Sequence, residues 1–360
     1  MKSGRTIQEV LIELQRQQGA KADYRVLTSD VVMDADFGQP MLRVVDDGVD
    51  RIEPLDIRQT AHRQIGAYLD IPNKYYDRML EKDPSLLAYN VNRWFQQEPE
   101  QRMLRTMDGH ARAFLSNRYR RIDHLDIATV TLPLLSELKD ARFESCEITE
   151  ERMYIKVVNP RLQAEVVPGD IVQAGIIISN SETGQGALCI QPLAYRLVCR
   201  NGMVVNDAKL RRNHIGRIES SGEDFFLYSE ETLKADDKAF VLKIKDTVKA
   251  AVDEARFARV IDKMRESAGV PLDTKKIPAI VKMASSNFGI TDEESEGVLQ
   301  HLIENGDFSL YGLANAVTRF SQDVESYDRA TKLEEIGYSV MTMHPALVRQ
   351  LNQMEVLAAA

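Results

Sequence analysis

The sequence predicts an α+β fold in which an N-terminal helical cap covers a mostly antiparallel sheet and a mainly α-helical C-terminal domain follows. Three observations predict this order. Apolar residues recur at helical spacing up to about residue 97, alternate with polar residues over about 102–217, and return to helical spacing after residue 223. We therefore expect an α+β core over residues 1–222, with the cap at about 55–97 and the sheet region at about 102–217. An acidic helical domain should occupy residues 223–345, and residues 346–360 should form a frayed tail.

The composition is that of an ordinary globular protein. Of the 360 residues, 44% are hydrophobic and 28% are charged, which excludes a mostly disordered, collagenous or disulfide-scaffold chain. No run of 18 apolar residues occurs, so we expect no membrane span. The first residues mix charges with apolar side chains and lack the apolar core of a signal peptide. Because the three cysteines also form no C-x-x-C pair, we expect a reducing, cytoplasmic location.

The N-terminal third shows helix patterns and one hairpin pattern. Helices are expected from Thr6 to Gln18, from Asp56 to just before Pro72, over the segment PNKYYDRML, and from Ser85 onward. A hairpin is expected where Val31–Met33 and Met41–Val45 flank a loop that contains glycine and proline. His62 and the only tryptophan, Trp94, are assigned to the packing of this helical unit.

The middle of the chain alternates as strands do. The segment HARAFLSNRYRRID predicts two short strands around Ser116-Asn117, and a helix should follow from Asp126 to Lys139. Further strands are expected near residues 143–148, 153–158, 172–179, 188–191 and 195–199. The loop NSETGQG, residues 180–186, joins two of them, and Asn201-Gly202 predicts a hairpin turn.

The last part of the chain returns to helical patterns. Ser220-Ser221-Gly222 predicts a linker, and one long helix is expected from Glu231 to Glu266, ended by Gly269 and Pro271. Shorter helices are expected over residues 278–286, 294–305 and 310–324.

Charge is distributed unevenly along the chain. The net charge is -9, and residues 218–360 carry 16 Lys/Arg against 25 Asp/Glu, whereas residues 1–217 carry 30 of each. Two segments inside the neutral part are strongly basic. Residues 101–121 hold six arginines and one aspartate, and residues 195–217 hold five arginines and a lysine against one aspartate. Such local clustering, rather than the total, makes the electrostatic footprint of a nucleic-acid-binding protein.

The residues that we expect to contact nucleic acid lie in these two basic segments. They are Arg112, Arg118, Tyr119, Arg120, Arg121, Arg196, Arg200, Lys209, Arg211 and Arg212. On a strand, Arg118 and Arg120 would share one face, with Tyr119 on the other. Guanidinium groups would grip phosphates while an aromatic ring stacks a base. The alternative is that these cations form ion pairs, in the second segment with the acidic C-terminal half.

Catalytic patterns are weak. The six histidines show no metal-binding spacing, and the grouping of Glu147, Glu150, Glu151 and Lys156 lacks the spacing of a nuclease carboxylate-plus-lysine site. NSETGQG has the composition of a phosphate-binding loop but matches neither the P-loop nor the dinucleotide pattern, so a plain hairpin loop is favoured. We therefore expect no catalytic residue, no metal and no cofactor, and we lean against an enzyme.

Several segments of this sequence resemble one known family. RAFLSNRYRRID, ISNSETGQG, YRLVCRNGM and YGLANAVTRF, with IPNKYYDRML upstream, resemble the phage/plasmid-like protein family, which carries the domain of unknown function 932 (DUF932). Their order and spacing fit over roughly residues 25 to 330. The resemblance implies an origin on mobile genetic elements or prophages, and it brings no established activity.

These observations favour a nucleic-acid-binding protein of a phage or plasmid element. We expect binding or annealing of single-stranded DNA in recombination, through a basic groove on the sheet, with no membrane partner. Assembly into a homo-oligomer would be in keeping with the sheet-and-helix core of phage annealing proteins, which is a fold-level analogy. The alternatives are a metal-dependent nuclease, or a non-enzymatic protein-interaction factor that acts on host defence or replication.

Overall fold

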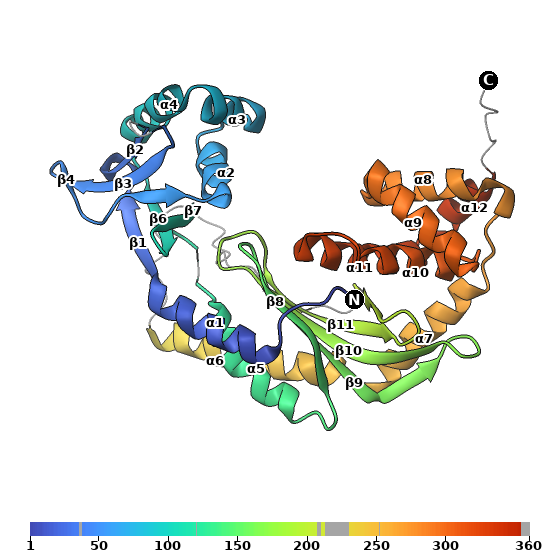
Figure 1. The fold of residues 1–360 in the computed structure, drawn as a ribbon. Coiled ribbons are helices and arrows are strands. Elements are labelled where there is room, and N and C mark those ends of the chain that lie inside the picture. The colour runs from blue at the N-terminus through green and yellow to red at the C-terminus, as the bar shows by residue number, and fades with distance from the viewer. Residues whose placement is uncertain (36–37, 120, 207–209, 213–229, 252, 354–360) are drawn as a thin grey trace, which may run out of the picture.

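A computed structural model describes residues 1–35, 38–119, 121–206, 210–212, 230–251 and 253–353. It confirms the α+β class: an N-terminal unit, a central sheet with helices on one face, and a group of C-terminal helices follow one another (Figure 1). The strands form two sheets, whereas the sequence predicted one. The strand that explains the difference is β1 (Lys21–Leu27), which pairs with β6 (Gln101–Met107) and so places the segment from residue 101 in a separate N-terminal sheet.

The N-terminal unit is a sheet covered by three helices. Its other strands are β2 (Val31–Asp34), β3 (Met41–Asp46), β4 (Val49–Asp50), β5 (Leu55–Ile57) and β7 (His110–Ser116), in the order β1-β6-β7-β5-β3-β2 with β4 on β3. The helices α2 (Gln59–Tyr68), α3 (Asn73–Lys82) and α4 (Pro84–Gln97) confirm the predicted cap. Ile65, Leu87 and Phe95 from this cap are fully buried against Leu42, Leu104 and Phe114 of the sheet. The hairpin of β2 and β3 is also confirmed.

The central sheet is antiparallel throughout. Its strands are β8 (Arg142–Ile148), β9 (Met153–Glu165), β10 (Ile171–Asn180), β11 (Leu188–Arg196) and β12 (Asn201–Val204), in the order β12-β11-β10-β9-β8, with β13 (Leu210–Arg212) paired to β11. One face packs on α1 (Ile7–Ala20), α5 (His124–Ser136) and α6 (Glu230–Ala251). Thr6 and Glu9 form a capping box that starts α1 where the sequence predicted it.

The C-terminal helices pack against the far part of the same sheet. They are α7 (Glu254–Ala268), α8 (Ile277–Phe288), α9 (Asp292–Asn305), α10 (Leu310–Phe320), α11 (Tyr327–Met341) and α12 (Pro345–Gln353), with a short 3-10 turn at Thr274–Lys276. Helix α11 was not expected from the sequence. Residues 346–353, expected in a frayed tail, lie in α12, whose Leu351 is fully buried. No helix in the described part of the chain combines the length and apolar character that a membrane span requires.

Two predicted turns are wrong, and packing explains both. Only the first of the two strands expected around Ser116-Asn117 exists, because β7 pairs with β6 through Asp108-Gly109. Both turn residues have positive φ, 51° and 74°, as a two-residue hairpin turn requires. Asn201-Gly202 lies in β12 rather than in a turn, and the turn falls at residues 197–200. A Cβ at Gly202 would lie 3.1 Å from the Met1 sulfur, so this glycine permits close packing.

The other differences concern continuity. The strands expected over residues 188–191 and 195–199 are one strand, β11, which passes through Pro192. The long helix expected from Glu231 to Glu266 is two helices, and the Asp253 side chain caps the second by accepting from the Arg256 backbone N–H. The expected linker at Ser220–Gly222 lies outside the described residues.

Candidate functional site

The loop NSETGQG joins β10 to β11 as expected, but its first half is buried between the two sheets. Asn180, Ser181, Glu182 and Thr183 are each at most 2% exposed. Residues of the N-terminal unit and of the segment that follows it hold the loop. The Gln64 amide donates to the Thr183 carbonyl over 2.6 Å, the Tyr119 hydroxyl to the Ser181 carbonyl over 3.2 Å, and the Asn180 amide to the Ile122 carbonyl over 2.8 Å. These hydrogen bonds therefore tie the loop of the central sheet to the N-terminal unit.

The Glu182 carboxylate lies at the centre of this junction. It accepts hydrogen bonds from the Arg112 guanidinium at 3.1 Å, the Lys21 ammonium at 3.4 Å and the backbone N–H of His124 at 2.7 Å. Burial raises the pKa of Glu182, but the charges of His124, Lys21 and Arg112 outweigh burial and hold that pKa well below its usual range. Arg112 thus neutralises a buried carboxylate, and it has no free face for a nucleic acid.

Arg105 forms a second buried centre beside Glu182. Its guanidinium contacts Asp23 at 2.8 Å and Asp123 at 2.8 Å, and it donates to the Glu182 carbonyl over 2.9 Å. The side chain is 2% exposed. Four hydrogen bonds, two of them to Asp23, use most of its five N–H donors. This arginine therefore serves the fold.

The remaining predicted residues of the first basic segment have different environments. Tyr119 is 6% exposed, so its ring is no surface platform for a base. Arg121 is 59% exposed and pairs with Asp23 at 3.2 Å. Arg118 lies exposed in the turn after β7 and makes no ion pair with any described residue. Arg120 lies outside the described residues. Arg118 lies in the turn at residues 117–118 rather than on a strand, and the predicted alternation with Arg120 falls outside the described residues.

The second basic segment extends along both ends of β11. Arg196, at the C-terminal end of β11, pairs with Asp170 at 2.7 Å, and its guanidinium lies 5.7 Å from the Tyr311 ring centroid. Arg200 is exposed in the turn that follows, where its φ is 50°. Arg211 is exposed on β13, which pairs with the other end of β11. Lys209 and the side chain of Arg212 lie outside what the structure describes.

The two basic segments meet at one pocket, which we call the inter-sheet pocket. It has a volume of about 540 Å³ and lies between α2, the ends of β6 and β7, the loop 180–186 and β13. The side chains that shape it are Tyr68, Arg102, Phe114, Tyr119 and Arg211. Arg196 is not among its described lining residues and pairs with Asp170 instead.

Arg102 is the distinctive residue of the inter-sheet pocket. Its guanidinium carbon lies 4.2 Å from the Tyr68 ring centroid and 5.4 Å from that of Phe114. Burial lowers the pKa of this arginine, and its Nε is buried without a hydrogen-bond partner. The nearest carboxylate, that of the exposed Glu100, is 3.8 Å away. Arg102 is thus a partly desolvated cation with donors to spare, held flat against an aromatic ring.

No metal cluster was found among the described residues. The carboxylates and the lysine that gave the nuclease alternative do not converge. Lys156 is fully buried and pairs with Glu334 at 2.8 Å, with its ammonium 4.6 Å from the Tyr327 ring centroid, whereas Glu147 pairs with Arg5 at 3.0 Å.

Sequence reasoning placed Arg102 in a basic segment but did not select it, and it treated Tyr68 as a core residue of α2. No local pattern joins the two, since 34 positions separate them in the chain. Arg102 is distinguished by its buried Nε, which has no hydrogen-bond partner, and by the 3.8 Å that separate it from its acidic neighbour Glu100; only the fold reveals both.

Comparison with known proteins yields one match. No curated protein and no solved structure matches the chain. The domain of unknown function DUF932 matches residues 113–336, which run from β7 to α11 and include the junction loop and the pocket residues Phe114, Tyr119 and Arg211. This match spans more than half of the chain. The chain therefore belongs to the DUF932 family.

Proposed function

We propose that this protein binds single-stranded nucleic acid in the cytoplasm, on behalf of a phage or plasmid element, and that the inter-sheet pocket is the centre of the binding surface. Arg102 and Arg211 would hold phosphates, and the half-exposed Tyr68 ring would support a base. Arg118 extends the cationic surface at the turn after β7. Arg120, Lys209 and Arg212 belong to the same two segments and remain expected contributors.

The observation that carries this proposal is the contrast between Arg102 and its neighbours. Arg105 and Arg112 lie in the same sheet and pair with carboxylates, Arg105 with Asp23 and Asp123 and Arg112 with the buried Glu182. Arg102 borders a pocket, has an orphan buried Nε, and has among the described residues no carboxylate closer than that of Glu100, at 3.8 Å. A cation that is desolvated without a matching anion costs folding free energy, so a ligand anion that completes its hydrogen bonds would gain affinity.

The dimensions favour a single strand over a duplex. A pocket of about 540 Å³ can receive one unstacked base with its phosphate, whereas a duplex keeps its bases stacked and paired. Arginine is also suited to this use, since its planar guanidinium both stacks on rings and forms paired hydrogen bonds to phosphate.

The test is a salt titration of binding to an oligothymidylate of about 16 nucleotides, a length matched to common single-strand site sizes. Arg102→Ala with Arg211→Ala should weaken binding at low salt by at least tenfold, since each charge-assisted hydrogen bond is worth about 1.5–3 kcal/mol. The slope of log K against log salt should fall by about 1.4, at about 0.7 per lost contact. The control is Lys245→Ala with Lys249→Ala on the exposed side of α6, which removes the same charge.

Two results would reject this proposal. One is no detectable binding of the wild-type chain to any oligonucleotide at low salt. The other is an equal loss in the Arg102/Arg211 and Lys245/Lys249 variants, because such a loss would show a dependence on net charge alone. A preference for duplex DNA over single-stranded DNA would reject the part of the proposal that the ligand is single-stranded. Annealing of complementary oligonucleotides, and the mass of the assembly in light scattering, test the remaining parts of the expectation.

One observation favours the protein-interaction alternative. Four large apolar side chains on α3 and α4 are exposed: Tyr75, Leu86, Tyr89 and Trp94. Leu86 and Tyr89 lie one helical turn apart, so they share a face of α4. If the protein acts as an interaction factor, Tyr89→Ser with Leu86→Ser should abolish its effect on host defence or replication. The affinity for single-stranded DNA should be unchanged.

A further inference from the structure

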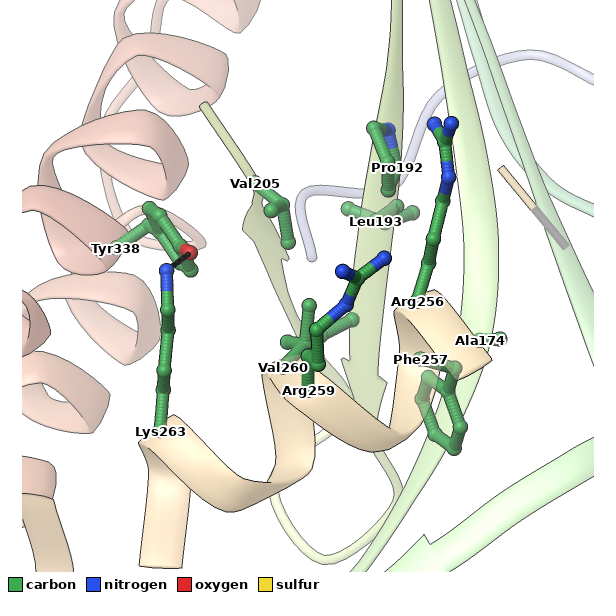
Figure 2. Close-up of a pocket in the computed structure, with 11 residues that line it drawn as sticks. Ala174, Pro192, Leu193, Val205, Arg256, Phe257, Arg259, Val260, Lys263 and Tyr338 are labelled. Atoms are coloured by element: carbon green, nitrogen blue, oxygen red, sulfur yellow. Dashed lines mark hydrogen bonds between the residues drawn. The ribbon is translucent and has the colours of Figure 1, made fainter. Parts of the chain in front are cut away.

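A second cationic pocket lies at the far side of the central sheet, which we call the α7 pocket. It has a volume of about 480 Å³ and lies between β11, the residue that follows β12, α7 and α11. Its floor is apolar and is formed by Ala174, Leu193, Ala194, Val205 and Val260. Its rim carries three cations, and none of the lining residues that the structure describes is an aspartate or glutamate. Pro192 and Tyr338 bound it on opposite sides (Figure 2).

The three cations come from one face of α7. Arg256, Arg259 and Lys263 follow the i, i+3, i+7 spacing of a helix face. Phe257, Ile261 and Met264 lie on the neighbouring face and anchor α7 in the C-terminal core. Figure 2 shows the Arg256 and Arg259 side chains extending from α7 toward β11, while Lys263 reaches Tyr338. The helix therefore aims its positive charges at the pocket while its apolar side fixes their position.

Two of these cations, Arg256 and Arg259, are not explained by ion pairs within the described part of the chain. Neither the Arg256 nor the Arg259 side chain forms a hydrogen bond or ion pair with any residue that the structure describes. Lys263 donates to the Tyr338 hydroxyl over 3.3 Å. On α7 itself, Asp262 is paired with Arg265. Residues 218–360 carry nine more acidic than basic residues. A face of α7 with three cations is therefore unusual in this half of the chain.

We propose that the α7 pocket binds a small phosphorylated molecule of about nucleotide size. Arg256, Arg259 and Lys263 would hold the phosphate, and the apolar floor would receive a planar or apolar body such as a nucleoside. Three cations match the two negative charges of a phosphate monoester better than the single charge of a carboxylate. The volume lies in the range of small-molecule sites, and the walls come from three elements, as is typical of such sites.

This proposal does not rest on nucleic-acid binding at the inter-sheet pocket. The two pockets share no lining residue, and β11 contributes Pro192, Leu193 and Ala194 to the α7 pocket alone. The two sites can therefore be removed one at a time.

The test is calorimetric titration of the full chain, at low salt, with inorganic phosphate and with adenosine monophosphate. Arg256→Ala with Arg259→Ala should weaken the binding of both probes by about tenfold or more. The charge-matched control Lys245→Ala with Lys249→Ala should leave both affinities unchanged. Val260→Phe, which fills the floor, should weaken binding of the nucleotide but spare inorganic phosphate. Thermal melts of every variant should show that it is folded.

Three outcomes would overturn the proposal. The first is no binding of phosphate or adenosine monophosphate by the wild-type chain. The second is that the Arg256/Arg259 variant behaves like the Lys245/Lys249 control. The third is that Arg256→Ala with Arg259→Ala abolishes oligothymidylate binding but not nucleotide binding, which would make this face part of the nucleic-acid surface. Failure of the Arg102/Arg211 test alone would leave the α7 pocket unaffected.

Discussion

The cations at the junction of the two sheets and those on α7 show two opposite uses of positive charge. At the junction, Arg105 and Arg112 are almost fully buried. Arg105 contacts the carboxylates of Asp23 and Asp123, and Arg112 contacts that of the buried Glu182. On α7, Arg256 and Arg259 are exposed at a pocket whose described lining residues include no acid. A buried cation must bring its counter-ion into the fold, whereas an exposed one can await a ligand. The local density of arginine in the sequence does not distinguish these two cases.

The largest effect that we expect is the loss of the central carboxylate at the junction. Glu182→Ala leaves Arg112 and Lys21 buried without their shared anion, and this should reduce the free energy of unfolding by about 3–5 kcal/mol. Urea denaturation measures it. Glu150→Ala is the matched control, since Glu150 is 61% exposed and pairs with Arg58 on the surface. A loss below about 1 kcal/mol for Glu182→Ala would mean that the junction cations do not depend on their counter-ion.

A glycine of the same loop tests how tightly it is packed. Gly184 has a φ of 78°, and a Cβ there would lie 2.6 Å from a Leu115 methyl group. Gly184→Ala should therefore cost about 1–3 kcal/mol of stability from strain and crowding together. Gly109→Ala shares the positive φ, 74°, but meets no atom within 4 Å, so its cost should be smaller, about 1 kcal/mol. Equal losses of stability in the two variants would show that the Leu115 side chain can move to make room for the added methyl group.

The next effect is a pH dependence of stability that comes from two buried histidines. Burial lowers the pKa values of His62 and His124 to about 4. In the unfolded chain a histidine titrates near 6.5. Between pH 6.5 and 4 the unfolded state therefore binds protons that the folded state does not bind. Stability should fall as pH falls through this window, by at most about 1.4 kcal/mol per pH unit for each histidine.

Denaturation between pH 7 and 5 measures this slope, above the range where most carboxylates titrate. His62→Gln and His124→Gln should each flatten it. His110→Gln is the control, because His110 is partly exposed rather than buried. An unchanged slope in His124→Gln would show that this buried imidazole takes up its proton as freely when folded as when unfolded.

The smallest effect should belong to the α7 cations. Arg256→Ala with Arg259→Ala removes no ion pair with a described residue, so the free energy of unfolding should change by less than about 0.5 kcal/mol. Thermal melts at matched ionic strength measure it. A loss of several kcal/mol would place these arginines with the junction cations, as parts of the fold rather than of a ligand site.

Much of the fold follows from local patterns. The helices α1 to α5 and α8 to α10, and most strands of the central sheet, lie where the apolar periodicity predicts them, because their buried faces repeat at 3.6 or 2 residues. The wrong predictions fall where the structure depends on a contact that the local pattern does not show. Gly202 fits against Met1 rather than forming a turn, and Asp253 divides a helical pattern that has no proline to mark the break. Helix α11 was missed, although most of its residues are buried.

The sequence by itself determined the α+β order, the antiparallel central sheet, the two basic segments and the resemblance to the DUF932 family. The tertiary structure alone decided that there are two sheets and which cations are already paired. It also showed that Glu182, in a loop expected to be plain, neutralises the charge between those sheets, and that α7 turns three cations toward a pocket. The physical reason is that periodicity reports which face of an element is buried, whereas the role of a charge depends on the dielectric around it and on the nearest opposite charge. Both are set by residues far away in the chain.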